Sequence, residues 1–223
     1  MKYSPEEFAN TVPRIIDCGL ADYRQILARQ HELSEMRRLG EIPDTVLAVE
    51  HHPVITLGAR RSANKLLADR ADLVRRNIDV VEIRRGGGTT AHNPGQLVFY
   101  PILHLQELGL GISEYVRTLE TIGIELLEQL DVHSEQRKGL AGLWVGHKKI
   151  ASVGVRVSKF VTHHGMAINI RNDLSIFDAL IPCGLEGVEM TSVLKETGKA
   201  PTMAAVKKRL FILLRKHLHK PTV

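Results

Sequence analysis

Strand-like runs that follow one another with no helix between them are the feature of this sequence that most constrains its fold. Several short segments are rich in β-branched or other apolar residues: 45–50, 54–57, 80–84, 97–103, 143–145, 150–157 and 166–170. The first two are separated only by His51-His52-Pro53, and Gly146-His147-Lys148 is expected to turn a hairpin before residue 150. This direct succession argues against a regular βαβ repeat and predicts a mixed sheet.

Three longer segments have the apolar spacing of amphipathic helices: 22–39, 113–130 and 202–218. Ser113 and Thr202 can cap the second and third of these helices. A shorter helix is predicted at 174–180, and Pro101 suits a sheet edge or a bulge. The predicted fold class is therefore α/β or α+β, a mixed sheet flanked by helices, with residues 1–223 forming a single domain.

The composition indicates a globular chain of a reducing compartment. Of the 223 residues, 43% are hydrophobic and 25% are charged, which is not the composition of a disordered chain. No run approaches the roughly 18 consecutive apolar residues of a membrane span, and residues 1–11 lack the features of a signal peptide, so we expect a cytoplasmic protein outside the membrane. Only Cys18 and Cys183 are cysteines, so no disulfide framework is expected.

The excess of basic residues favours an acidic partner, because the formal net charge is +5. Aromatic residues make up only 4% of the chain and no RNA- or DNA-binding motif is present, so no nucleic-acid partner is expected. An acidic protein is the class of partner that this charge then favours.

The segment 84–96, RRGGGTTAHNPGQ, has an unusual composition for a loop. Three consecutive glycines follow a predicted strand directly, and backbone amides there can approach a ligand without Cβ atoms in the way. A plain flexible loop is the alternative interpretation. The neighbouring Arg85, Thr90 and His92 favour a binding loop.

Nucleotide and metal sites are not supported by the sequence. The glycine segment formally fits G-x-G-x-x-A at 86–91, but Asn93-Pro94-Gly95 predicts a turn where a dinucleotide fingerprint would open a helix, and no Walker A motif occurs. The chain has 11 histidines, yet none has the spacing of a known metal motif, so no metal is expected. His92 and His164 are instead candidate polar groups of a pocket.

Cys183 and Lys149 are the candidate reactive residues. Cys183 lies in Ile181-Pro182-Cys183-Gly184, which predicts a constrained turn. A lone cysteine is more often a small buried residue than a nucleophile, and Cys18 is interpreted in that way. Lys149 begins an apolar strand, and alternation along this strand predicts that it shares a face with Ala151 and Val153.

Four segments in chain order resemble the bacterial lipoyl(octanoyl) transferase family: RRGGGTTAHNPGQ (84–96), KKIASVGVRV (148–157), HHGMAINI (163–170) and IPCGLEG (181–187). The resemblance extends over residues 50–193. Members of this family transfer an octanoyl group from acyl carrier protein to a lysine of lipoyl domains, the first step of lipoate attachment. The implied fold resembles the catalytic domain of biotin and lipoate protein ligases.

Matched motif by motif, the resemblance implies that Cys183 forms the acyl-thioester intermediate and that Lys149 is its partner. The implied substrate-binding residues are Arg85, Gly86, Gly87, Gly88, Thr89, Thr90, Ala91, His92, Ser152, Val153, Gly154, Gly165, Met166 and Ala167. Backbone amides at 86–90 or 183–184 are candidates to hold the oxyanion. No cofactor is implied.

The resemblance also implies the partners. They are octanoyl-acyl carrier protein as donor, and as acceptors the lipoyl domains of 2-oxoacid dehydrogenase complexes and the glycine cleavage H protein. We expect the chain to act as a monomer.

The sequence departs from the family at Ala91, where an aromatic residue is more common, and at Asn93, where glycine is more common. Both residues are expected to border the pocket. Three alternatives stay open: an ATP-dependent lipoate or biotin protein ligase with a similar glycine loop, a non-catalytic module that binds carrier protein, and a thioesterase. The presence of both Lys149 and Cys183 favours the transferase over the first two.

Overall fold

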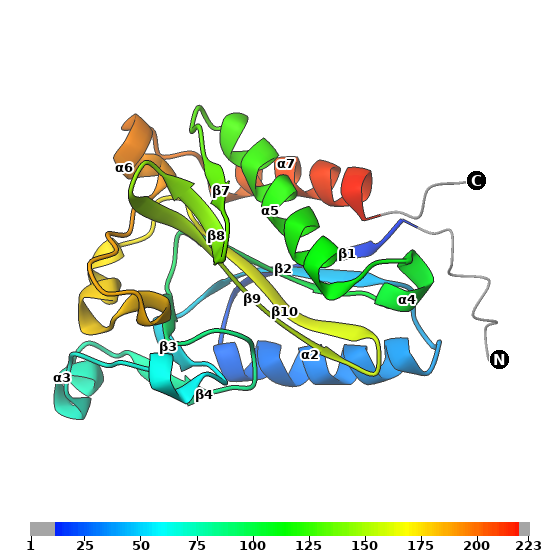
Figure 1. The fold of residues 1–223 in the computed structure, drawn as a ribbon, viewed down its shortest axis with the longest axis horizontal. Helices are drawn as coiled ribbons and strands as arrows, with labels where there is room; N and C mark the ends of the chain where they lie inside the picture. Colours follow the sequence, from blue (N-terminus) through cyan, green and yellow to red (C-terminus); the bar gives the residue numbers. More distant parts are fainter. Residues whose placement is uncertain (1–11, 219–223) are drawn as a thin grey trace.

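A seven-stranded sheet forms the centre of the computed structural model, which describes residues 12–218 (Figure 1). In spatial order its strands are β1 (Arg14–Ala21), β2 (Thr45–His51), β6 (Gln96–Ile102), β10 (Val161–Asn169), β9 (Lys148–Ser158), β8 (Leu140–Val145) and β7 (Glu135–Arg137). β1 and β2 pair in parallel, and the other neighbouring pairs are antiparallel. The predicted mixed sheet is therefore confirmed.

A second, three-stranded sheet holds the glycine segment. Its strands are β4 (Asp79–Glu82), β3 (Val54–Leu57) and β5 (Thr90–His92), with β3 in the middle. β3 pairs in parallel with β4 and antiparallel with β5. The three consecutive glycines lie in the connection from β4 to β5, so this sheet fixes both ends of their loop.

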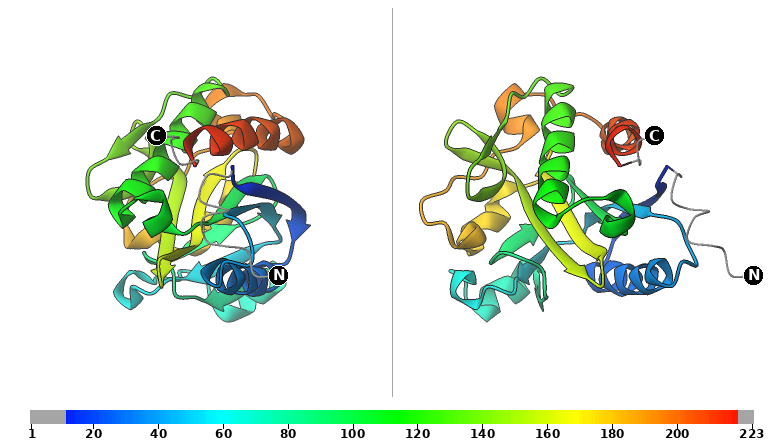
Figure 2. Two further views of the ribbon diagram at one scale, coloured as in Figure 1. Left: turned by 90° about the vertical axis from the view of Figure 1, so that its right-hand side faces the viewer. Right: turned by 45° about the vertical axis from the view of Figure 1, so that its right-hand side comes forward.

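Helices cover both faces of the large sheet. α5 (Ile112–Glu128) and α7 (Met203–His217) lie on one face and α2 (Tyr23–Arg38) lies on the other (Figures 1 and 2). Because side chains alternate along β2, Val46 and Ala48 join the core beneath α5 and α7, whereas Leu47 and Val49 join the core beneath α2. The shorter helical segments are η1 (Arg61–Ala63), α3 (Arg70–Arg75), α4 (Leu105–Leu108), η2 (Leu174–Ala179), η3 (Pro182–Gly184) and α6 (Val193–Thr197).

The three long helices lie where the sequence predicted them. Thr202 caps α7 as expected, since its hydroxyl accepts a hydrogen bond from Ala205 N. The predicted cap of α5 is wrong, because the helix already begins at Ile112 and Gly111 is its N-cap, whose N–H donates to Glu114 Oε2 at 2.7 Å. The segment predicted as a helix at 174–180 forms the 3₁₀ helix η2.

Pro101 lies inside the large sheet rather than at its edge. β6 pairs with β2 on one side and β10 on the other, and its ladder with β10 ends where Phe99 pairs with Met166. Beyond that point, Thr162 Oγ1 donates to Pro101 O at 2.6 Å and Thr162 N donates to Leu103 O at 3.0 Å. The edge position is therefore wrong, and the missing proline N–H falls where the ladder is interrupted.

Gly123, in the middle of α5, marks a close approach of this helix to the sheet. A Cβ at this position would lie 2.7 Å from Leu143 Cδ1 and 2.8 Å from Met166 Cε. Glycine inside a helix lowers the stability of the helix by about 1 kcal/mol relative to alanine. The close packing against Leu143 and Met166 accounts for its presence here.

No helix within residues 12–218 has the length and apolar character needed to cross a membrane. Residues 1–11, where we expected no signal peptide, lie outside the described part of the chain.

Ile122→Ala is expected to lower the free energy of unfolding by about 2–5 kcal/mol, because the Ile122 side chain is buried between α5 and the sheet. Ile212→Ala is the matched control, since Ile212 is 61% exposed on α7, and it should change this free energy by less than about 0.5 kcal/mol. Urea denaturation measures both effects. Equal losses in the two variants would contradict the core described above.

Candidate active site

Lys149 and Cys183 lie in contact as a buried amine and a thiol. Lys149 Nζ is 3.7 Å from Cys183 Sγ and donates a hydrogen bond to Ala141 O at 2.8 Å. Lys149 is only 1% exposed, and its Nζ lies 5.1 Å from the centre of the Trp144 ring, within the range of a cation–π contact. An ammonium beside a thiol favours the thiolate, which is the nucleophilic form.

A β-bulge aims Lys149 into this site. β8 and β9 pair Leu143 with Ala151 and Trp144 with Lys149, so that Ile150 is an extra residue in β9. Ile150 and Ala151 consequently both pack in the core beneath α5. The prediction that Lys149 shares the face of Ala151 assumed strict alternation, which the bulge breaks.

Cys183 occupies a tight turn with a left-handed backbone. Its φ angle is 56°, and Cys183 N donates to Thr89 O at 2.8 Å. A Cβ on Gly184 would lie 2.8 Å from Ala63 Cβ, and one on Gly88 would lie 2.3 Å from Ala63 O. Close backbone contacts therefore hold the cysteine turn against the glycine segment, and the predicted constrained turn is confirmed.

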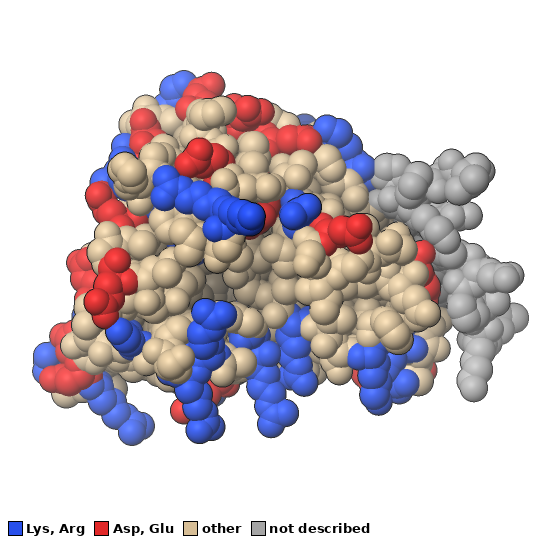
Figure 3. Space-filling view, in the orientation of Figure 1, with Lys and Arg blue, Asp and Glu red and all other residues tan. Residues whose placement is uncertain are grey.

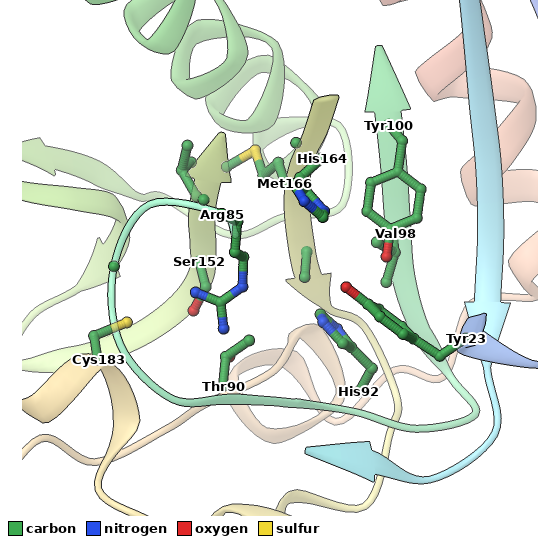
Figure 4. A pocket seen from close by; sticks show the side chains of 15 residues that line it. Tyr23, Arg85, Thr90, His92, Val98, Tyr100, Ser152, His164, Met166 and Cys183 are labelled. Carbon is green, nitrogen blue, oxygen red and sulfur yellow. The ribbon is translucent and has the colours of Figure 1, made fainter. Parts of the chain in front are cut away.

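A narrow cleft of about 430 Å³, including its open mouth, extends from Cys183. Its lining residues are Tyr23, Arg85, Gly87, Thr90, His92, Val98, Tyr100, Ser152, Val153, Gly154, His164, Gly165, Met166, Ala167 and Cys183. Among these lining residues, Cys183 lies at one end of the cleft, and Tyr23 and Tyr100 lie at the other end (Figure 4).

The apolar walls of the cleft belong to both cores of the molecule. Val153 and Met166 pack with the core beneath α5 and α7, whereas Val98 and Ala167 belong to the core beneath α2. Gly154 and Gly165 pair directly across β9 and β10, and both line the cleft. A Cβ on Gly165 would lie 2.2 Å from Phe99 O, and one on Gly154 would lie 2.9 Å from Arg85 Cδ, so both glycines allow close packing at the cleft wall.

Most of the residues proposed from the sequence line this cleft: Arg85, Gly87, Thr90, His92, Ser152, Val153, Gly154, Gly165, Met166 and Ala167. Gly86, Gly88, Thr89 and Ala91 are not among its lining residues. Thr89 accepts the Cys183 N–H behind the cleft, and Ala91 is fully buried in the core of the small sheet.

Asn93 also lies away from the cleft. Its Nδ2 donates to Asp173 O at 2.7 Å, and its Oδ1 accepts from Asn172 Nδ2 at 3.0 Å. The expected position of Ala91 and Asn93 at the border of the pocket is therefore corrected. The departure from the family at Ala91 affects packing in the core, and the departure at Asn93 affects hydrogen bonds of a loop. Neither residue belongs to the cleft wall.

Tyr23, Val98 and Tyr100 are lining residues that sequence reasoning did not propose. Tyr23 comes from the start of α2, and the other two come from β6. The sequence showed them only as apolar members of a helix stripe and of a buried strand. No local motif marks them, because tertiary packing brings them to the cleft.

Arg85 brings a buried positive charge into the cleft. It is 7% exposed, and its guanidinium donates to Thr56 Oγ1 at 2.8 Å and to Gly86 O at 3.0 Å. Its Nε has no hydrogen-bond partner among residues 12–218. Burial lowers the pKa of Arg85, although a guanidinium stays charged at neutral pH.

Aromatic side chains form the end of the cleft away from Cys183. The rings of Tyr23 and His92 stack at 5.8 Å, and His51 Nε2 lies 2.9 Å from the Tyr100 hydroxyl. Burial lowers the pKa of His51 to about 4, and that of His92 and of His164 to about 3. These histidines are therefore neutral near pH 7, and His92 and His164 line the cleft as predicted. No cluster of His, Cys, Asp and Glu within residues 12–218 is arranged to hold a metal.

Residues 22–213 match the family model described as the lipoyl protein ligase A/B catalytic domain. This chain belongs to that family. An octanoyltransferase of Syntrophobacter fumaroxidans is 42% identical over 202 residues, which cover 91% of this chain and 89% of the relative. A mitochondrial octanoyltransferase of Arabidopsis thaliana is 38% identical over 180 residues, which cover 80% of this chain and 77% of the relative.

Solved structures of two protein ligases have the same fold. A lipoate-protein ligase A bound with ATP superposes with a TM-score of 0.77 at 17% identity, over 93% of this chain and 86% of that chain. A biotin protein ligase from Aquifex aeolicus has a TM-score of 0.52 at 14% identity, over 93% of this chain and 69% of that chain. At these identities the likeness establishes the fold alone, and it confirms the predicted resemblance to the catalytic domain of these ligases.

The buried His51 predicts a specific loss of stability in acid. Because its pKa is lowered from 6.5 to about 4 by burial, the unfolded state binds a proton first as the pH falls, so stability present above pH 6.5 is lost toward pH 4. Between about pH 7 and about pH 5, His51→Gln should lose about 2 kcal/mol less unfolding free energy than the wild type. Urea denaturation at both pH values measures this difference. The exposed neighbour provides the control His52→Gln, which should match the wild type, and a His51→Gln variant that does so would contradict the assignment.

Proposed function

We propose that residues 1–223 form a single octanoyltransferase domain in which Cys183 carries the octanoyl group and Lys149 moves the proton. The observation that carries this proposal is the 3.7 Å contact between Lys149 Nζ and Cys183 Sγ at the end of a cleft with apolar walls. Relatives named octanoyltransferases, at 41% and 42% identity over most of the chain, support an acyltransferase of protein lipoylation.

In the first half-reaction the Cys183 thiolate attacks the carbonyl carbon of the donor thioester. A bond from Cys183 Sγ to this carbon forms, and the bond from the carbon to the donor sulfur breaks. The departing sulfur takes a proton from the Lys149 ammonium. Lys149 is then a neutral amine beside an acylated cysteine.

In the second half-reaction the amine of the acceptor lysine attacks the Cys183 thioester. The amide bond forms, Cys183 leaves as a thiolate, and the neutral Lys149 takes the proton that the attacking amine releases. The starting pair of ammonium and thiolate is thereby restored. The two halves together need no external acid or base.

We also propose that Arg85 stabilises the oxygen that becomes negative in each half-reaction. Of the backbone N–H groups at 86–90 and 183–184 that the sequence offered for this role, those of Gly86, Thr89, Cys183 and Gly184 donate to backbone carbonyls. Arg85 lines the same cleft and has an unpartnered Nε. A donor already fixed in a desolvated site stabilises a developing oxyanion without reorganisation.

The cleft walls suit a saturated acyl chain. Val98, Val153, Met166 and Ala167 present apolar side chains to it. Each methylene removed from water contributes about 0.8 kcal/mol, so burial of the acyl chain supplies a large part of substrate binding.

An ATP-dependent ligase is the second candidate, because a lipoate-protein ligase solved with ATP has the same fold. A ligase activates its acid as an adenylate and makes no use of a thiol. The contact between the buried Lys149 and the half-buried Cys183 favours the transferase.

Wild-type protein mixed with octanoyl carrier protein in the absence of ATP is expected to form a covalent octanoyl adduct that intact-mass analysis detects. Cys183→Ser should abolish the thioester and lower octanoyl transfer about 10³-fold or more. Cys18→Ser is the control, because Cys18 packs against the core beneath α2, and it should keep both adduct and transfer. Transfer that requires ATP, or that proceeds with no adduct on the wild type, would show that the proposed function is wrong.

We also propose octanoyl-acyl carrier protein as the donor, and lipoyl domains and the glycine cleavage H protein as the acceptors. The name of the relatives supports the acyl group, and the net charge of +5 supports acidic protein partners. The cytoplasmic location and the monomeric state stay predictions.

Exposed arginines lie on or next to the glycine segment. Arg60 N donates to Gly87 O at 3.2 Å, and Arg84 is the first residue of the glycine segment. Arg61 and Arg84 line an adjoining groove, and neither of them, nor Arg60, forms an ion pair among the residues described. Lys and Arg side chains lie on two sides of a hollow on this face of the molecule (Figure 3). This distribution supports docking of an acidic carrier at the mouth.

Arg84→Ala is expected to raise the KM for octanoyl carrier protein about three- to tenfold, because it removes one charge of the docking surface. Acylation by the small donor octanoyl-N-acetylcysteamine should not change, since this donor has no protein to dock. Lys208→Ala removes one exposed charge from α7 and is the control that should leave both donors unaffected. An unchanged KM for the carrier in Arg84→Ala would contradict the proposed surface.

A further inference from the structure

A carboxylate lies behind Lys149, on the side away from the cleft. Glu120 is a residue of α5 and is only 7% exposed, between the fully buried Leu119 and Ile122. Its Oε1 accepts a hydrogen bond from Gly142 N at 2.8 Å. A carboxylate on a helix face that otherwise packs against the sheet is costly to bury unless it has a polar partner.

The partner of Glu120 is the same peptide group that holds Lys149. The Ala141–Gly142 peptide presents its N–H to Glu120 Oε1, and its carbonyl accepts from Lys149 Nζ at 2.8 Å. In a trans peptide these two groups point in opposite directions, so carboxylate and ammonium lie at the two ends of one planar unit. Cys183 Sγ, at 3.7 Å from Nζ, continues this chain of contacts.

The backbone at Gly142 allows the Ala141–Gly142 peptide to lie between Glu120 and Lys149. Gly142 has a φ of 116°, and a Cβ there would lie 2.3 Å from Ala151 O and 2.9 Å from Lys149 Cε. A side chain at this position would displace Lys149. Glycine therefore allows the peptide to lie directly against the lysine side chain.

We propose that Glu120 is a positioning residue that acts on Lys149 through the Ala141–Gly142 peptide. The carboxylate accepts the Gly142 N–H, which increases the negative charge on the Ala141 carbonyl oxygen and strengthens its hydrogen bond to the Lys149 ammonium. Glu120 thereby holds Nζ beside Cys183 and favours the protonated form that the first half-reaction uses. This inference rests on the proposed function of the Lys149 and Cys183 pair.

Burial raises the pKa of Glu120, and this effect outweighs the lowering by its hydrogen bond from Gly142 and by the charges of Lys149 and Arg117. The hydrogen bond and the two positive charges favour the ionised carboxylate that the proposed role requires. Glu120, Arg117 and Ala141 line a groove between α5 and the β7–β8 hairpin. Among the described residues, the titratable and charged groups near Lys149 include Glu120 from α5, Cys183 from η3 and Arg137 from β7. The Arg137 guanidinium lies 4.9 Å from the centre of the Trp144 ring that Lys149 also contacts.

The test measures how the alkylation of Cys183 by iodoacetamide depends on pH, in a Cys18→Ser background so that only one thiol reacts. Glu120→Gln keeps an oxygen that accepts from Gly142 N but removes the charge. It should raise the midpoint of thiol reactivity by about 0.5 pH unit or more and slow acylation by octanoyl carrier protein about three- to tenfold. Glu114→Gln is the matched control, since Glu114 also lies on α5 and accepts from a backbone N–H, that of Gly111, but is exposed.

A double-mutant comparison separates the relay from a merely structural role. Lys149→Met should itself raise the midpoint, and adding Glu120→Gln should then cause no further shift, because the group through which Glu120 acts is gone. A midpoint that Glu120→Gln leaves unchanged, an equal shift in Glu114→Gln, or a full further shift in the Lys149→Met background would overturn the proposal. If Lys149→Met leaves thiol reactivity and acylation unchanged, the proposed function fails instead.

Discussion

Burying one amine is the constraint on which the rest of this site depends. A charge in the protein interior is costly unless polar groups replace the water it loses. Lys149 Nζ is surrounded by the Ala141 carbonyl, the Trp144 ring and the Cys183 thiol. β8 holds the first two of these groups and the η3 turn holds the third, so Lys149 connects β8 to the cysteine turn.

The glycines of the site serve this assembly more than they serve a ligand. We expected the three consecutive glycines to expose amides, but a Cβ on Gly88 would meet Ala63 O at 2.3 Å, and one on Gly58 would meet Gly87 O at 2.3 Å. Backbone segments from η1, the glycine loop and the cysteine turn therefore pack without side chains between them. Direct contacts between backbone segments therefore position Cys183. Few substitutions at these glycines can preserve such contacts.

The sequence predicted the helices and strands whose apolar residues recur with a regular spacing. It missed most of the elements that show no such spacing. α2, α5, α7 and most strands of the large sheet have runs long enough to show helical or alternating spacing. β5, β7, α3 and α6 were not predicted because their few residues show no period, and β1 because Asp17 and Gly19 interrupt its apolar run. In the site, sequence motifs identified Cys183, Lys149 and Arg85. The bulge at Ile150 and the position of Tyr23 and Tyr100 in the cleft wall depend on tertiary contacts, which no local sequence pattern indicates.

The cleft lined by Gly154 and Gly165 is walled by side chains of the protein core. Its walls are side chains that already belong to the two cores of the molecule, Met166 above and Val98 below the sheet. On the proposed function, an acyl chain bound there would become a shared part of both cores. An acyl chain that is too short would leave a cavity, and one that is too long would overpack the interior. Chain-length preference would then depend on the whole hydrophobic interior, including the close approach of α5 at Gly123, and substitutions that never touch the substrate would change it.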